Sequence, residues 1–173
     1  MKLRILVFMF VSLSTLTFSQ ELWNKVEFGM TSMQIKEIHQ NCTEPEIIRK
    51  GPTGAYTGLK IDGYSILGSL YNISFIFSSE DKLDTVSIIP NEKNLDVNSG
   101  NGRFQELNGI LKTIYGSETY HVKYGSSGTM TEYACWITQE KNVLLRLDSV
   151  SSVNMTVLFI QYSKSKIKEL EKL

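Results

Sequence analysis

Apolar and polar residues alternate along several stretches of this chain, as they do in strands that bury one face. In the first half, the segment 71–77 is apolar at every second position, and a polar turn at 78–82 separates it from the segment 83–89. The earlier segment 64–67 is placed to pair with them. We therefore expect three or four antiparallel strands before residue 90.

The second half contains a similar set. The segments 132–138, 142–150 and 154–162 are separated by short polar turns. Tyr133, Cys135 and Ile137 share one face of the first segment, and Val143, Leu145 and Leu147 share one face of the second. Consecutive strands with short connections favour an antiparallel meander.

A predicted helix precedes the first set of strands. Thr31 is the expected N-cap, and Gln34 lies three residues later, where it completes a capping box. Met30 and Ile35 flank this cap as a hydrophobic staple. Each of these residues has a structural reason for its position, so we interpret this stretch as the start of a scaffold helix.

A second helix is predicted before the second set of strands. Phe104, Leu107, Leu111 and Ile114 recur at the spacing of one helical face. Gly116 follows the last of them and is placed to end the helix.

The order of elements therefore suggests an α+β fold with two tandem repeats, each a helix followed by antiparallel strands, and with both helices packed on one sheet face. Whether the repeats share one sheet stays open at this point. The expected organisation is a signal peptide at 1–19, a first repeat at 20–90, a linker at 91–102, a second repeat at 103–163 and a charged tail at 164–173, with 20–173 forming one compact domain.

Three stretches carry a resemblance to known families. A "GMT" turn opens the first helix, "ISFIFSSEDKLDTVSI" (73–88) forms a hairpin, and "YG" ends the second helix. Over residues 26–162 this pattern resembles the β-lactamase-inhibitor proteins and the small lipoproteins of the outer-membrane barrel-assembly machinery. The resemblance implies a role in protein–protein contact. The chain departs from the lipoproteins because it lacks their lipid-attachment cysteine.

The first residues have the features of a secretory signal peptide. Lys2 and Arg4 precede a short apolar run, and small residues precede an expected cleavage between Ser19 and Gln20. No later segment has the roughly 20 apolar residues of a transmembrane helix. We therefore expect a periplasmic or secreted protein without a transmembrane segment or lipid anchor in its mature form.

The charge of the chain bears on its possible partners, and its cysteine content on a possible disulfide. After cleavage, 16 basic and 18 acidic residues remain, without a basic stripe, which disfavours nucleic-acid binding. Cys42 and Cys135 could form a disulfide in an exported chain, or could be two free, buried side chains.

Catalytic signatures are weak. His39 and His121 lack a metal-binding spacing, so we expect no metal site and no cofactor. A small hydrolase that uses Ser126 or Ser127 with His121 is one alternative, although the surrounding sequence is not a nucleophile elbow. We expect a non-enzymatic protein.

We expect two long loops, at 51–64 and 117–130, and aromatic residues in them suggest a binding surface. The candidate binding residues are Tyr56, Tyr64, Tyr120, His121 and Tyr124. The main hypothesis is a binding module whose partner is a protein or an envelope component. A second hypothesis is a carrier of a small apolar ligand, with a cavity lined by Phe75, Phe77, Ile110 and Phe159.

Overall fold

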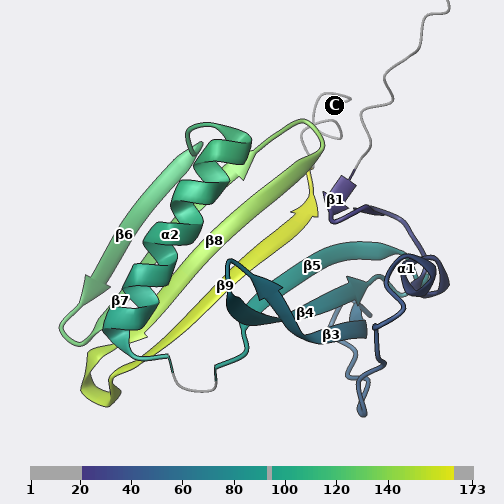
Figure 1. Cartoon of the computed structure of the whole chain (residues 1–173), viewed down its shortest axis with the longest axis horizontal. Coiled ribbons are helices and arrows are strands. Elements are labelled where there is room, and N and C mark those ends of the chain that lie inside the picture. The colour runs from purple at the N-terminus through teal and green to yellow at the C-terminus, as the bar shows by residue number, and fades with distance from the viewer. Residues whose placement is uncertain (1–20, 93–94, 166–173) are drawn as a thin grey trace, which may run out of the picture.

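A single seven-stranded antiparallel sheet dominates the computed structural model (Figure 1), which describes residues 21–92 and 95–165. Its strand order is β3-β4-β5-β9-β8-β7-β6, and a separate two-stranded sheet joins β1 to β2. The strands are β1 (Glu21–Trp23), β2 (Val26–Glu27), β3 (Tyr56–Ile66), β4 (Ser69–Phe77), β5 (Leu83–Pro90), β6 (Tyr120–Ser126), β7 (Thr129–Ile137), β8 (Lys141–Val150) and β9 (Met155–Lys164). The helices are α1 (Ser32–Ile38), α2 (Val97–Tyr115) and the short 3-10 helix η1 (Ser151–Val153).

The prediction of two helix-plus-strand repeats is wrong, because the fold is predominantly β and the strands β3 to β9 from both halves form one continuous sheet. The first half contributes β3 to β5, and the second half contributes β6 to β9. The pairing of β5 with β9, from Thr85 opposite Ser163 to Ile88 opposite Ile160, joins them. The expected signal peptide and most of the charged tail lie outside the described residues.

The helix α1 begins as predicted but does not cover a sheet face. Thr31 accepts a hydrogen bond from the backbone N–H of Gln34, and the side chain of Gln34 accepts one from the backbone N–H of Thr31, which confirms the capping box. The helix is seven residues long and buries only Ile35 among its own residues. A helix of two turns presents too little apolar surface to cover a sheet, and Figure 1 shows α1 at the end of β3 to β5.

The helix α2 covers one face of the β6–β9 half. It contacts mainly β8 and β9, and Phe104, Leu107 and Leu111 are buried against the sheet as predicted. Gly116, with a φ of 80°, caps its C-terminus, which confirms the predicted end. The helix begins at Val97, inside the predicted linker, because Asp96 supplies an N-cap that accepts from the backbone of Asn98 and Ser99.

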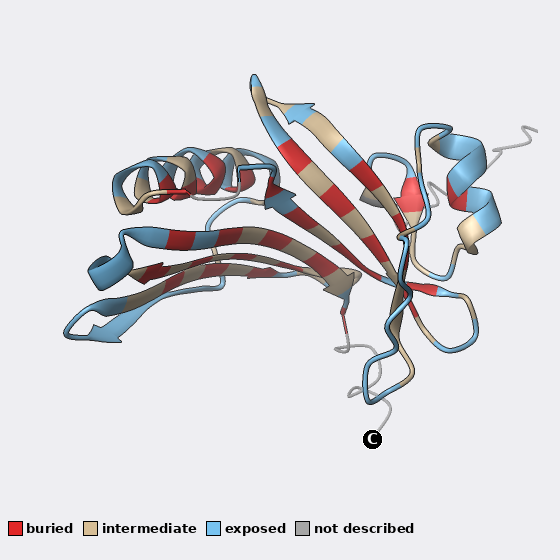
Figure 2. Ribbon diagram, turned by 90° about the horizontal axis from the view of Figure 1, so that it is seen from below, coloured by how far each residue is buried: buried red, intermediate tan, exposed pale blue. Residues whose placement is uncertain are grey.

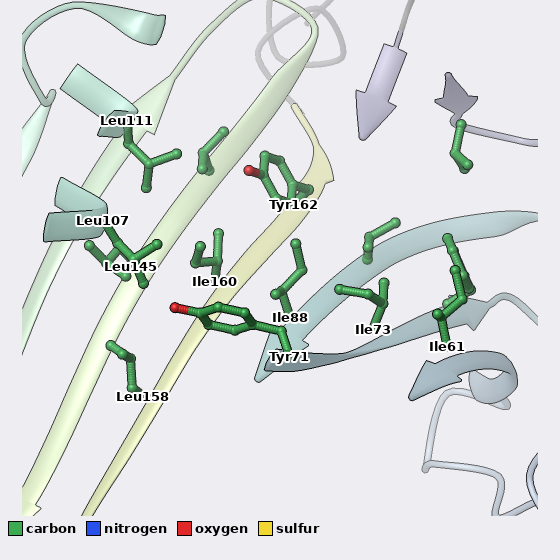
Figure 3. Packing of buried hydrophobic residues seen from close by; sticks show 14 of the residues in the cluster. Ile61, Tyr71, Ile73, Ile88, Leu107, Leu111, Leu145, Leu158, Ile160 and Tyr162 are labelled. Carbon is green, nitrogen blue, oxygen red and sulfur yellow. The ribbon is translucent and has the colours of Figure 1, made fainter. Parts of the chain in front are cut away.

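One apolar core runs through both halves of the molecule. Figure 3 shows Leu107 and Leu111 of α2 above Leu145, and Tyr71 of β4 extending toward Ile160. All of these residues belong to one buried cluster. The α2 side of the sheet is therefore the interior of the protein.

The predicted strands are present, with two differences. The segment 64–67 is the end of the much longer β3, whose two register shifts against β4 interrupt the alternation. The segment 120–126, predicted as loop, is the edge strand β6, and all its residues are exposed. Residues 120–124 alternate apolar and basic side chains, but both faces of the strand are exposed, so this alternation does not mark a buried face. Within the described ranges, neither α-helix combines the length and the apolar character needed to cross a membrane.

Candidate functional site

The face of β6–β9 that points away from α2 is not covered by any described element. Figure 2 shows α2 on one side of these strands only, with buried positions alternating with partly exposed ones along each strand. We call this surface the open face. Its large side chains include Tyr120, Val122, Tyr124, Tyr133, Arg146, Val157 and Phe159.

The strand register aligns several of these side chains into one row. Val122 lies opposite Tyr133, Tyr133 opposite Arg146, and Arg146 opposite Phe159. Directly opposite residues in antiparallel strands share a face and lie about 5 Å apart. The row therefore runs unbroken across four strands.

Contacts within the open face hold its polar and aromatic groups in place. The guanidinium of Arg146 lies 6.0 Å from the ring centre of Phe159, and its Nε is 2.9 Å from Asp148 Oδ2. Tyr124 meets Tyr133 edge to face, with ring centres 6.4 Å apart. Aromatic rings and a fixed arginine are the groups that contribute most at protein interfaces.

Two valines and two tyrosines of this face remain accessible. Tyr120 is 57% exposed, Tyr124 56% and Val157 48%. Val122 lies between the two tyrosines on β6 and is also exposed. Exposed apolar groups gathered on one side of a sheet indicate an interaction site more strongly than scattered ones.

The possible disulfide between Cys42 and Cys135 is not formed, and both thiols are free. Cys135 lies on β7, whereas Cys42 precedes the residue that bridges to β3. Five strand spacings separate these strands, roughly 24 Å, and a disulfide needs Cα atoms within about 7 Å. Burial raises the pKa of the Cys42 thiol to about 11 and also raises that of Cys135, so neither is an activated nucleophile.

His121 lies on the opposite side of β6, in a charged cluster beside α2. Its Nδ1 is 3.1 Å from Glu118 Oε1 and its Nε2 is 3.0 Å from Glu132 Oε1. Lys123 Nζ contacts Glu132 at 2.9 Å, and Lys112 Nζ contacts Glu118 at 3.0 Å. The two ring nitrogens can both donate hydrogen bonds to these carboxylates only when each nitrogen carries a proton.

The two carboxylates of this cluster have lowered pKa values. Desolvation alone would raise the pKa of Glu132, but hydrogen bonds from Lys123 and His121 outweigh it. The pKa of Glu118 is lowered by its own backbone N–H and by Lys112. The cluster thus binds β6 to β7 and to the end of α2 through charge.

The geometry does not bring His121 to a serine. Both of its ring nitrogens are engaged by carboxylates, and neither Ser126 nor Ser127 is among its hydrogen-bond partners in the described structure. Ser126 lies five residues further along β6, about 17 Å away in an extended strand.

An apolar groove opens on the α2 side of the sheet, between α2 and the curled tip of the β3–β4 hairpin. Figure 2 shows this hairpin rising on the same side of the sheet as α2. The groove has a volume of about 380 Å³, within the range of small-molecule sites. We call it the α2 groove. Its main lining residues are Trp23, Tyr64, Ile66, Leu67, Ile110, Ile114, Ile160 and Tyr162.

Aromatic contacts build one wall of this groove. The ring centre of Trp23 lies 5.1 Å from that of Tyr64, edge to face, and 5.5 Å from that of His39. The hydroxyl of Tyr64 accepts a hydrogen bond from the Asn24 amide at 3.2 Å. Of the cavity-lining residues predicted from the sequence, only Ile110 lies here. Phe75 and Phe77 are fully buried, and Phe159 is on the open face.

The five predicted binding residues are therefore divided among different surfaces. Tyr120 and Tyr124 lie on the open face, Tyr64 lines the α2 groove, and His121 is in the charged cluster. Tyr56, at the start of β3, donates to Asp81 Oδ1 at 2.9 Å and stacks on Phe77. These contacts connect β3 to β4 and to the turn between β4 and β5, so Tyr56 has a structural role there.

The open-face residues of β7 to β9 were not among the predicted site residues. The alternation of segment 142–150 places Arg146 on the face opposite Val143, Leu145 and Leu147. Segment 154–162 is apolar on both faces at 157–160, so the sequence did not separate Val157 and Phe159 from the core. The open face becomes a candidate site only when β6 is recognised, because β6 carries its most exposed aromatic residues.

No group of three or more histidine, cysteine or acidic side chains within residues 21–92 and 95–165 is arranged to hold a metal ion. Comparisons with protein-family models, curated proteins and solved structures found no match to this chain.

Proposed function

We propose that this protein is an exported, non-enzymatic binding module that contacts another protein of the cell envelope through the open face. The observation that supports this proposal is the row of Val122, Tyr133, Arg146 and Phe159, flanked by exposed tyrosines, on a sheet face that nothing described covers. Tyrosine and arginine with a polar surrounding are typical of the centres of protein interfaces.

The proposal is tested with the mature protein immobilised on a support and exposed to envelope extract. A retained protein is identified, purified, and its affinity measured by titration. We expect the Tyr124→Ala variant to bind at least tenfold more weakly, a loss of about 1.4 kcal/mol. Ile114→Ala is the matched control, because Ile114 is also exposed, at 61%, but lies on α2 on the other side of the sheet.

The control variant is expected to bind like the wild type. Equal affinity of the wild type and Tyr124→Ala for the purified partner would contradict the proposal, as would the absence of any retained protein.

The α2 groove favours a second candidate function, the binding of a small apolar molecule. Its wall contains Trp23, one of the two tryptophans of the chain. Replacing the other by the change Trp136→Phe leaves Trp23 as the tryptophan that reports on the groove. Titration with a medium-chain fatty acid should then change the Trp23 emission to saturation. Ile110→Lys, which places a charge in the groove, should abolish that change, whereas Val157→Lys on the open face should leave it intact. An unchanged emission in the Trp136→Phe protein would exclude this candidate.

A further inference from the structure

The two edge strands of the large sheet, β3 and β6, differ in whether other segments of the chain pair with their outer sides. The edge strand β3 is bridged by Thr43, which exchanges backbone hydrogen bonds of 2.8 and 2.9 Å with Lys60, and by Lys50 opposite Tyr56. The other edge, β6, pairs with β7 and has no partner on its outer side within the described residues. Alternate residues of such a strand direct free N–H and C=O groups outward.

β6 also lacks the usual features that prevent edge pairing. Natural edge strands are protected by proline, by charges over the edge or by a covering segment. β6 contains no proline, and its single lysine, Lys123, is drawn onto Glu132 of β7. On the open face it presents Tyr120, Val122 and Tyr124, all exposed.

The sequence of β6 indicates what fits this edge. Residues 120–124 read Tyr-His-Val-Lys-Tyr, with the same pattern of aromatic, basic and aliphatic residues in both directions from Val122. A two-fold axis relates two antiparallel copies of one strand and requires this kind of self-complementarity. An unrelated peptide partner would impose no such symmetry on β6.

We propose that two copies of this protein pair through β6, antiparallel, around a two-fold axis at Val122. Val122 then lies opposite the partner's Val122, and Tyr120 lies opposite the partner's Tyr124. Aromatic cross-strand pairs of this kind stabilise antiparallel strands. The sheets of the two copies become continuous, and their open faces lie side by side on the same surface.

The charges of β6 allow this register. On the other side of the strand, His121 comes opposite the partner's Lys123. In each copy His121 already contacts Glu118 and Glu132, and Lys123 contacts Glu132. The basic groups that the pairing brings together are therefore balanced by carboxylates of their own chain. A register centred on Lys123 would instead place two lysines opposite each other and lose the tyrosine pairs.

The test is the mass of the mature protein in solution, measured by sedimentation velocity without any partner. We expect the wild type to sediment as a dimer. Val122→Lys and Val122→Glu each place two like charges together at the axis, so each variant alone should show half the wild-type mass. An equimolar mixture of the two variants should regain the dimer mass, because Lys and Glu then meet across the axis.

Val157→Lys is the matched control, since Val157 is an exposed valine of the same face in an interior strand. It should remain dimeric, and the circular dichroism of all three variants should match that of the wild type. A monomeric wild type at its highest soluble concentration would overturn the proposal. Failure of the mixed variants to associate, or loss of the dimer in Val157→Lys but not in Val122→Lys, would also overturn it. The proposal does not depend on the function proposed above, because it needs no second protein.

Discussion

At the scale of single residues, the charged cluster around Glu132 is the point where burial and charge compete. The Glu132 residue is only 3% exposed, yet its carboxylate remains in its charged form because Lys123 and His121 hydrogen-bond to it. These contacts cross from β7 to β6, the strand that has the least apolar burial. The attachment of β6 to the sheet therefore depends on ionisation.

This cluster makes stability depend on pH in the acid range. The folded state lowers the pKa of Glu132 and of Glu118, so each carboxylate binds protons less readily when folded than when unfolded. Their contribution to stability is fully present above the unfolded value, about 4.3, and is lost as the pH falls through the lower folded values. We expect the melting temperature of the wild type to decrease as the pH is lowered below this unfolded value.

Glu132→Gln tests the cause of that decrease. The variant should lose about 1–3 kcal/mol of unfolding free energy at neutral pH, the cost of removing hydrogen bonds between charged groups. Its melting temperature should also vary less with pH in the acid range. Glu46→Gln, which changes an exposed carboxylate, is the control and should follow the wild type. An acid profile of Glu132→Gln that parallels the wild type would contradict this explanation.

At the scale of elements, the close approach of α2 to β9 depends on one glycine. Gly100 is buried in the first half of the helix, and a Cβ there would lie 3.0 Å from Cβ of Thr156. Thr156 cannot simply turn away without loss, because its hydroxyl donates to the carbonyl of Leu95 at 2.9 Å. The helix is therefore seated against β9 through a contact that admits no side chain.

Two glycine-to-alanine changes in α2 should have opposite effects on stability. Gly109 lies on the same helix with open space around it, so Gly109→Ala should stabilise by about 0.5–1 kcal/mol. Gly100→Ala gains the same helix propensity but forces α2 away from β9, at a net cost of about 1–3 kcal/mol. Chemical denaturation of both variants measures the difference. Equal stabilisation by both changes would show that α2 is not packed this closely.

The elements that the sequence predicted well are those with a buried face. The capping box at Thr31, the helical face ending at Gly116 and the alternation of the interior strands all have a local pattern. β6 buries neither face, so the short alternation of residues 120–124 was not recognised as a strand, and the glycine and asparagine residues between 97 and 102 obscured the start of α2. The open face was also missed. It is made of outward-facing residues from several strands, and local patterns do not show which strands are neighbours.

Strand order was the other property that local patterns could not supply. The repeated order of helix and strands suggested two similar units, but α1 is too short to cover a sheet. The first half instead extends the sheet of the second half through β5 and β9. Whether the two halves form separate sheets or one sheet is decided by pairing between strands that are far apart in the sequence.

At the scale of the whole molecule, the pairing of β5 with β9 and the shared core predict that both halves unfold together. Ile88 of β5 lies opposite Ile160 of β9, and both are buried in the same cluster. Neither half could unfold without exposing apolar surface of the other. We therefore expect one two-state transition, as for most domains of this size.

The two tryptophans of the chain make this expectation measurable, because they lie in different halves. Trp23 packs on Tyr64 and Phe75 of the first half. Trp136 is buried in β7, and its Nε1 donates to the carbonyl of Gly116 at 2.9 Å. In Trp136→Phe, fluorescence reports on the surroundings of Trp23, and in Trp23→Phe on the surroundings of Trp136. Within each variant, denaturation followed by fluorescence should coincide with denaturation followed by far-UV circular dichroism, which reports on the whole sheet. Either fluorescence midpoint lying apart from the dichroism midpoint of the same variant would mean that the halves fold as separate units, and that the contact between β5 and β9 is weaker than its buried isoleucines imply.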